Sequence, residues 1–310
     1  MIAQNPAKTG RMATTNVMPN STSTQTLRSK LSDYYTLTKP EVNLLILMTT
    51  SAGYVLASPS PFRVLGLVNT LLGTLLVASG TATLNQWMER VWDGRMRRTA
   101  SRPLPSGRMA AREALGFGLL LSFAGGLYLA LTVNVVAAGL AIATLLSYLL
   151  IYTPLKRKTP LCTFLGAFPG ATPTLIGWAG ASGRIDPQAW FLFAILFLWQ
   201  FPHFLAIALM YREDYARAGY KMLPDFDREA RFTRAEILSL TLVLVVITLL
   251  PSTRVEPLYG VVMLLAGGFL LYYVAKLTRS ASIVLASRLV HASVIYLPVV
   301  LVAVVIAFKA

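Results

Sequence analysis

Three oxygen-bearing side chains, Asn85, Glu89 and Asp93, recur every four residues where a long apolar segment ends. In a helix, a step of four residues turns the side chain by only about 40°, so all three fall on one face. At the edge of a membrane these groups are costly unless they pair or hold a cation. Oxygen ligands without imidazole or thiolate suit Mg²⁺, which binds one or two carboxylates together with substrate phosphates. The spacing therefore predicts a magnesium site.

Basic side chains follow this face directly and could complete a site for a diphosphate. Guanidinium groups bind phosphate oxygens in a bidentate manner, and a metal would neutralise other oxygens of the same group. The alternative is that Glu89 and Asp93 simply pair with these arginines at the membrane interface. The arginines concerned are Arg95, Arg97, Arg98, Arg102 and Arg108.

A second polar group occupies residues 199–224. We expect Pro202 to break an apolar helix near its end, with His203 directly after it. His203 is interpreted either as a buried, hydrogen-bonded structural group or as a substrate contact. Just beyond this segment, Glu213 or Asp214 could complete the metal site from across a helical bundle.

A third element is the basic turn that contains Lys156 and Arg157, a few residues after Tyr152. Membrane topology alone could explain this turn. Taken with the other two elements, however, it closes a ring of carboxylates and cations over an apolar interior. Such an arrangement suits an enzyme that joins a long apolar diphosphate to another membrane-soluble molecule.

The composition predicts that membrane helices position these groups. The chain has 310 residues, of which 55% are hydrophobic and 13% charged, with a mean hydropathy of +0.60. These values exclude a soluble globular enzyme, because so few polar residues cannot cover its apolar surface. We expect an all-α, polytopic bundle of about nine transmembrane helices around a central cavity. The predicted spans are 42–57, 64–86, 114–132, 135–153, 161–181, 188–210, 237–252, 258–275 and 289–308.

The net charge of +15 follows the membrane topology and does not indicate a nucleic-acid partner. Of the 28 Lys and Arg residues, all but four lie in the amino-terminal stretch and in every second loop of the predicted topology. By the positive-inside rule, the amino terminus and these loops are cytoplasmic. The four on the other side are Arg63, Arg184, Arg254 and Lys309.

We expect residues 1–35 to form a disordered polar tail and residues 36–310 to form one transmembrane domain. The tail has no apolar stretch typical of a secretory signal peptide, and a mitochondrial transit peptide is the alternative. Its short polar character favours the bacterial cytoplasmic (inner) membrane over the mitochondrial inner membrane. A single cysteine, Cys162, and two histidines, His203 and His291, exclude a Cys-rich zinc site and a His-rich metal cage. We interpret His291 as structural.

At these residues the chain resembles the UbiA-type intramembrane prenyltransferases, and among them the protoheme IX farnesyltransferase (heme O synthase) subfamily. The resemblance also covers residues 37–40, 152–157 and the string Trp-Gln-x-Pro-His-Phe at 199–204, which generic UbiA relatives lack. The subfamily's motif Asn-xxx-Asp/Glu-xxx-Asp, with Met-x-Arg-Thr-xx-Arg-Pro-Leu after it, stands here as Asn85, Glu89, Asp93, Met96, Arg98, Thr99, Arg102, Pro103 and Leu104.

The resemblance implies a nine-span bundle in which Mg²⁺ bridges two acidic motifs to farnesyl diphosphate. The farnesyl group would pass to a vinyl group of heme b, and the product, heme O, would be the precursor of heme A for terminal oxidases. A downstream heme A synthase is a candidate partner. The second acidic motif of the wider family has two aspartates four residues apart, but position 210 is Met here. Only Asp214 of that motif is therefore present.

The resemblance assigns Asn85, Glu89, Asp93 and Asp214 to the metal and His203 to heme. The expected diphosphate contacts are Arg98, Arg102, Lys156 and Arg157. Three alternatives stay open at this point. One is a UbiA-type enzyme acting on an aromatic quinone precursor, another is a membrane transporter, and the last is a heme-binding scaffold without catalysis.

Overall fold

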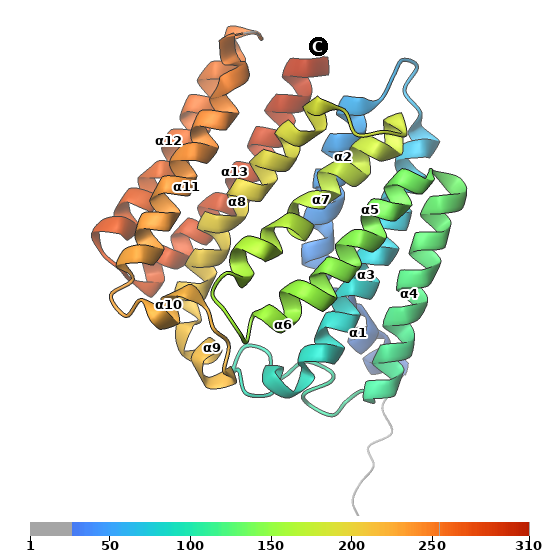
Figure 1. Cartoon of the computed structure of the whole chain (residues 1–310), viewed down its shortest axis with the longest axis vertical. Coiled ribbons are helices and arrows are strands. Elements are labelled where there is room, and N and C mark those ends of the chain that lie inside the picture. The colour runs from blue at the N-terminus through green and yellow to red at the C-terminus, as the bar shows by residue number, and fades with distance from the viewer. Residues whose placement is uncertain (1–26, 254, 310) are drawn as a thin grey trace, which may run out of the picture.

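Helices make up the regular structure of this computed structural model, which describes residues 27–253 and 255–309. No strand occurs within those residues. The predicted all-α membrane bundle is thus confirmed (Figure 1). The longer helices are α1 (Leu27–Thr38), α2 (Pro40–Ala57), α3 (Val64–Asp93), α4 (Ala111–Thr132), α5 (Val135–Leu146), α7 (Cys162–Ser182), α8 (Pro187–Met210), α11 (Arg231–Leu249), α12 (Pro257–Arg279) and α13 (Ile283–Lys309).

Shorter helical elements connect these at one end of the bundle or extend them. A π-helical turn, Ser147–Tyr152, and α6 (Thr153–Leu155) continue α5. The pieces α9 (Arg212–Ala218) and α10 (Leu223–Phe226) follow α8, and a 3₁₀ turn, Leu250–Thr253, ends α11. π-turns are often found at functional sites, and this one leads directly to Lys156.

All nine predicted spans coincide with helical segments, and seven of these are long and apolar enough to cross a membrane. The seven are α3, α4, α5 with its extension to Leu155, α8, α11 with its extension to Ser252, α12 and α13. The segments α2 and α7 lie in the same bundle and have 18 and 21 residues, but they fall outside that group. The number of nine crossings therefore stays a prediction.

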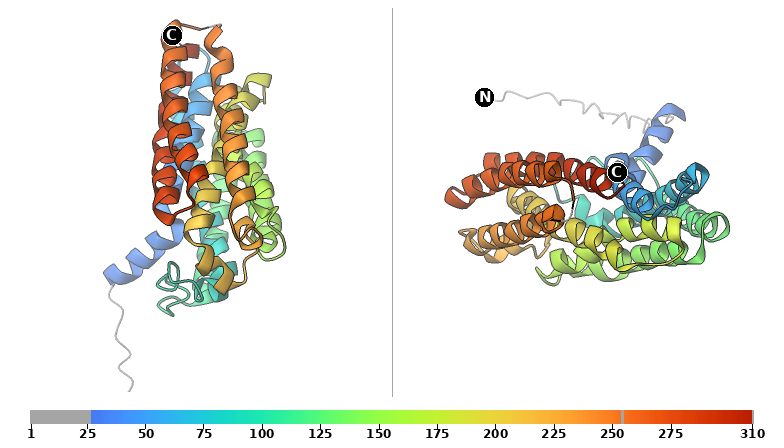
Figure 2. Two further views of the ribbon diagram at one scale, coloured as in Figure 1. Left: turned by 90° about the vertical axis from the view of Figure 1, so that its left-hand side faces the viewer. Right: turned by 90° about the horizontal axis from the view of Figure 1, so that it is seen from above.

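Helices α2 and α7 approach each other closely because glycines face backbone across their contact. A Cβ atom on Gly53 would collide with the carbonyl oxygen of Thr174, and one on Gly177 would collide with that of Thr50. Small residues are the usual means by which membrane helices come together, because lipid gives no hydrophobic drive for helix association. This contact joins the two parts of the bundle. Seen from above, α3–α5 lie to one side of it and α11–α13 to the other (Figure 2).

The basic loops gather at one end of the bundle. The segment 94–110, the turn after α6, and helices α9 and α10 lie at the lower end in Figure 1. Helix α1 lies there too, whereas the connection after α2 and the end of α13 lie at the opposite end. Lys309 donates a hydrogen bond to the carbonyl of Ser58 at that opposite end. The arrangement agrees with the alternation of charge in the sequence.

Two local expectations differ from the structure. Residues 27–35, assigned to the polar tail, belong to α1, because Leu37 is fully buried, Asp33 pairs with Arg108 and Tyr34 donates to Glu113. The rest of the predicted tail, residues 1–26, lies outside the described residues. The break expected at Pro202 is absent, since α8 continues to Met210. Packing against α7, α11 and α13 holds α8 together despite the lost backbone hydrogen bond.

Candidate active site

The predicted polar face lies at the last turns of α3 and is buried. Asn85, Glu89 and Asp93 are 1%, 6% and 1% exposed. The side-chain amide of Asn85 donates to Glu89 Oε2 at 3.0 Å, and also to Thr153 Oγ1 at 3.2 Å. The helical spacing therefore does bring these side chains together on one face. It directs them inward, against the turn after the π-helix.

Both carboxylates of this face are paired with cations, one from the loop that follows α3 and one from the turn after α6. Lys156 Nζ lies 2.9 Å from Glu89 Oε1, and Arg102 donates to Asp93 Oδ2 at 2.7 Å. Although burial lowers the pKa of Lys156, the charge of Glu89 outweighs it and holds that pKa above its ordinary value. Two of the four predicted diphosphate contacts, Arg102 and Lys156, thus contact the carboxylates of the α3 face directly. Of the three elements expected to converge, the α3 face with its following loop and the turn that contains Lys156 meet here.

Lys39 is a third cation at this face, and the sequence analysis gave it no role. Its Nζ donates to Asn85 Oδ1 at 3.1 Å. The backbone of Lys39 is left-handed, with φ of 51°, a strained conformation for a residue with a Cβ that is often found at functional sites. Burial lowers its pKa to about 7, and nearby Arg102 and Lys156 add to this effect. Residues 37–40, which the resemblance covers, include Lys39, and its position directly before the proline that begins α2 is a second signal.

The residues of this face fit a magnesium ion. The donors are two carboxylates and one amide oxygen, the hard ligands that Mg²⁺ prefers, and Mg²⁺ takes its remaining ligands from water and substrate phosphates. Within the described residues, no group of three His, Cys, Asp or Glu side chains converges to hold a metal without such help. Asn85, Glu89 and Asp93 could therefore hold the ion jointly with a bound diphosphate.

Two predicted site residues, Asp214 and Arg98, contact each other through the Asp214 carboxylate and the backbone of Arg98. Asp214 accepts from the backbone N–H of Arg98 at 3.3 Å and from Arg217 at 2.9 Å. Burial acts to raise the pKa of Asp214, but the Arg98 and Arg97 amides and the Arg217 charge outweigh it, so that the pKa is lowered. The Arg98 guanidinium lies 4.7 Å from the ring of Tyr211. The structure does not bring these two side chains to Glu89 and Asp93.

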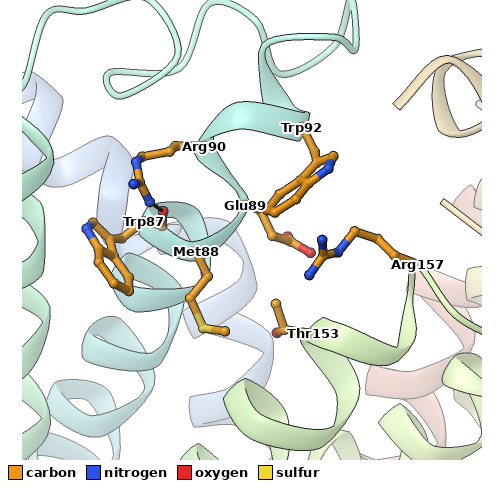
Figure 3. Close-up of a pocket in the computed structure, with 7 residues that line it drawn as sticks. All are labelled: Trp87, Met88, Glu89, Arg90, Trp92, Thr153 and Arg157. Carbon is orange, nitrogen blue, oxygen red and sulfur yellow. Dashed lines mark hydrogen bonds between the residues drawn. The ribbon is translucent and has the colours of Figure 1, made fainter. Parts of the chain in front are cut away.

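A pocket of about 260 Å³ opens beside Glu89. Figure 3 shows Glu89, Trp92 and Arg157 converging on one side of it, with Thr153 beneath them. The Arg157 guanidinium lies 3.8 Å from the centre of the Trp92 ring. Arg157, the last of the predicted diphosphate contacts, therefore lies at the rim of this pocket rather than on a carboxylate.

His203 lies on α8 and is fixed by α13. Its Nδ1 is 2.8 Å from Ser293 Oγ, and its ring stacks on Trp199 with the centroids 4.7 Å apart. Trp199 itself donates to the backbone carbonyl of Ser293 at 2.7 Å. The interpretation of His203 as a hydrogen-bonded structural group holds for its Nδ1 atom. The other ring nitrogen, Nε2, has no hydrogen-bond partner among the described residues.

We expect Lys156→Met to destabilise the protein because it leaves the buried Glu89 without its partner. Breaking one side of a buried ion pair costs about 3–5 kcal/mol. The midpoint of thermal unfolding in detergent, followed by tryptophan fluorescence, measures this. The double variant Glu89→Gln/Lys156→Met is the control and should regain most of the lost stability. A single variant as stable as the unaltered protein would contradict the pairing.

Comparison with known proteins identifies a family. Residues 46–295 match the UbiA prenyltransferase family. A protein from Solibacter usitatus named protoheme IX farnesyltransferase is 47% identical over 281 residues, which cover 87% of this chain and 96% of that protein. Another protein of that name, from Koribacter versatilis, is 46% identical over 72% of this chain and 73% of its own length.

Solved structures share the fold at low sequence identity. A structure of digeranylgeranylglyceryl phosphate synthase has a TM-score of 0.73 at 20% identity and covers 90% of this chain and 98% of its own. A UbiA homologue from Archaeoglobus fulgidus, bound to DMAPP and Mg²⁺, has a TM-score of 0.64 at 17% identity and covers 88% and 99%. These likenesses establish the helical architecture.

Proposed function

The chain belongs to the UbiA prenyltransferase family, and from this membership we propose that it transfers a farnesyl group from farnesyl diphosphate to a vinyl group of heme b. The product would be heme O, used in heme A and terminal oxidase biogenesis. One observation carries the proposal for this site. A buried face of carboxylates, which form ion pairs with Lys156 and Arg102, lies at one end of a bundle of apolar helices. The choice of heme and farnesyl rests on the relatives named above.

Residues of the α3 face and its cations would bind the leaving group. Asn85, Glu89 and Asp93 are the proposed metal ligands, and Mg²⁺ bound there supplies neutralising charge for the diphosphate oxygens. Arg102, Lys156 and Arg157 are the proposed diphosphate contacts from the chain itself. Arg98 and Asp214 remain proposed members of the site, and each would first have to leave its present partner.

The proposed reaction depends on stabilising the negative charge that develops on the leaving diphosphate. Cations held in place stabilise the departing diphosphate as the bond between the allylic carbon and oxygen breaks. The electron-rich vinyl carbon of heme then forms the new carbon–carbon bond. Water adds to the resulting cation beside the porphyrin and loses a proton, which leaves the hydroxyl group. The apolar helices exclude water from the allylic cation until the new bond has formed.

His203 is the proposed heme contact, through the ring nitrogen that Ser293 does not hold. We expect His203→Ala to weaken heme b binding about tenfold, the loss expected for one good polar contact to a charged group. Binding of farnesyl diphosphate should be unchanged. Titration of the purified protein with heme b, followed by absorbance, measures the first, and isothermal titration calorimetry measures the second.

A matched control for this experiment is His291→Ala. His291 is exposed on α13 and its Nδ1 contacts the carbonyl of Ser287 within the same helix, so that heme binding should be unchanged. Equal heme affinity in the His203 variant and in the unaltered protein would return His203 to a structural role. Tight binding of 4-hydroxybenzoate, with none of heme b, would favour the alternative of a quinone-precursor enzyme.

The protein is an integral membrane protein, as its apolar helices and its family require. We propose the bacterial cytoplasmic membrane as its location, in keeping with its bacterial relatives, with the amino terminus and the active site on the cytoplasmic side. Heme A synthase, which would consume the product, is the proposed partner. A transporter is not favoured, because the α3 acids lie at one end of the bundle and not midway along it.

A further inference from the structure

Tyr220 is held against the active site by backbone hydrogen bonds. It follows Gly219, whose φ of 77° ends α9, and its N–H donates to the carbonyl of Tyr215 at 2.9 Å. This is the pattern of a Schellman turn, in which the residue after the glycine packs back on the helix. Next to it, the N–H of Lys221 donates to the carbonyl of Lys156 at 2.7 Å. The two loops are thereby joined beside the Glu89–Lys156 pair.

The hydroxyl group of Tyr220 is buried and has no partner with good hydrogen-bond geometry among the described residues, although it lies near the carboxylate of Glu89. The whole residue is only 2% exposed, and its ring packs in a small cluster with Met96 and Ala218. A phenylalanine would fill the same space without leaving a buried donor unsatisfied. Such orphan groups are rare in folded proteins and call for an explanation, because an unmade hydrogen bond costs free energy.

Charged groups of the active site surround this hydroxyl. Burial, and after it the negative charge of Glu89, raises the pKa of Tyr220 well above its ordinary value. The charge of Lys156 acts to lower this pKa, whereas the charge of Asp93 and a contact with the Glu89 carboxylate raise it. A tyrosine hydroxyl carries its proton at neutral pH and can serve as a donor. Glu89 already accepts from Asn85 and from Lys156, and the geometry of Tyr220 leaves its hydroxyl without a good bond to this carboxylate, so that an acceptor which enters the site can take its proton into a hydrogen bond.

We infer that Tyr220 is a further substrate-binding residue, whose hydroxyl donates a hydrogen bond to an oxygen of the bound diphosphate. This inference rests on the proposed function only in that the site takes a diphosphate. With Lys156 and Arg102, Tyr220 gives donors from three separate loops, and a diphosphate offers enough oxygens to accept from all of them. Tyr220 lies within residues 199–224, but the sequence pattern there indicated no role for it.

The variant Tyr220→Phe tests this inference because it removes only the hydroxyl. The probe is inorganic pyrophosphate with Mg²⁺, titrated calorimetrically into the full chain in lipid nanodiscs. We expect the Kd for pyrophosphate to rise about tenfold, as for a lost hydrogen bond to a charged group. The KM for farnesyl diphosphate should rise by a similar factor. The thermal midpoint should stay the same or increase, because no partner in the fold loses a bond.

Tyr128→Phe is the matched control. The hydroxyl of Tyr128 donates to Asn69 Oδ1 at 2.9 Å, on α4 and α3 and away from the α3 acids, so its loss should leave the Kd for pyrophosphate unchanged. The inference is overturned if Tyr220→Phe binds pyrophosphate as the unaltered protein does, or if it lowers the thermal midpoint more than Tyr128→Phe. Absence of pyrophosphate binding by the unaltered protein also overturns it. If Tyr220→Phe raised the Kd for pyrophosphate tenfold but the unaltered protein left heme b unmodified, the inference would stand and heme b would be rejected as the acceptor.

Discussion

Replacing Asp93 with Asn should reduce farnesyl transfer by roughly a hundredfold to a thousandfold, the size of loss seen when one charge-stabilising group is removed from a transition state. Asp93 is 1% exposed and accepts from Arg102 at 2.7 Å. Asparagine keeps the volume and an acceptor oxygen for Arg102, but it removes the negative charge that a magnesium ion needs. Turnover of farnesyl diphosphate by the purified enzyme measures the effect.

Asp186→Asn is the matched control for this loss of charge. Asp186 also accepts hydrogen bonds from two side chains, those of Trp178 and Arg184, but it lies between α7 and α8 at the opposite end of the bundle. Its variant should transfer farnesyl at the normal rate. The thermal midpoint should be normal for Asp186→Asn and should fall less for Asp93→Asn than for Lys156→Met, because Arg102 is partly exposed and keeps an acceptor oxygen. Nearly normal turnover by Asp93→Asn would reject Asp93 as a metal ligand.

The second large effect concerns the fold. Gly177→Ala should destabilise the bundle by about 3 kcal/mol, at the upper end of the usual cost of overpacking. The added Cβ would meet the backbone carbonyl of Thr50 on α2, and backbone cannot rotate away as a side chain can. The thermal midpoint in detergent and the yield of folded protein measure this effect.

Gly268→Ala, on α12, provides the comparison. A Cβ at Gly268 meets no atom within 4 Å, so this variant should keep its stability or gain a little through the lower conformational freedom of its unfolded chain. If both alanine variants melted at the same temperature, the close contact between α2 and α7 would not be a determinant of stability.

The part of the site that could be predicted from the sequence is the part that depends on helical periodicity. Residues four apart on one long helix must share a face, so that Asn85, Glu89 and Asp93 could be grouped without knowledge of the tertiary structure. Lys156 and Arg102 were expected nearby because the charge distribution places their loops at the same end of the bundle. The apolar spans were predictable because their length follows from the thickness of the bilayer.

The rest depends on contacts between segments distant in the chain. Lys39 reaches Asn85 across 46 positions, and a single lysine carries no periodic signal. Tyr220 lies in a loop, where an aromatic residue is ordinarily interpreted as packing. Asp214 and Arg98 are on the expected side of the bundle, but the Asp214 carboxylate accepts from the backbone of Arg98, 116 positions away, and the Arg98 guanidinium bonds to Tyr215. Pro202 was expected to end a helix because proline removes a hydrogen bond, whereas the surrounding helices stabilise α8 through that position.

The central claim is tested most directly by incubating the purified protein with heme b, farnesyl diphosphate and Mg²⁺, with a parallel sample in EDTA, and analysing the heme by mass spectrometry. We expect a heme whose mass has increased by one farnesyl group and one hydroxyl group, formed only where Mg²⁺ is free. Heme that returns unmodified while farnesyl diphosphate is consumed with an aromatic acceptor would contradict the proposed acceptor. Product formed equally in EDTA would contradict the metal site on α3.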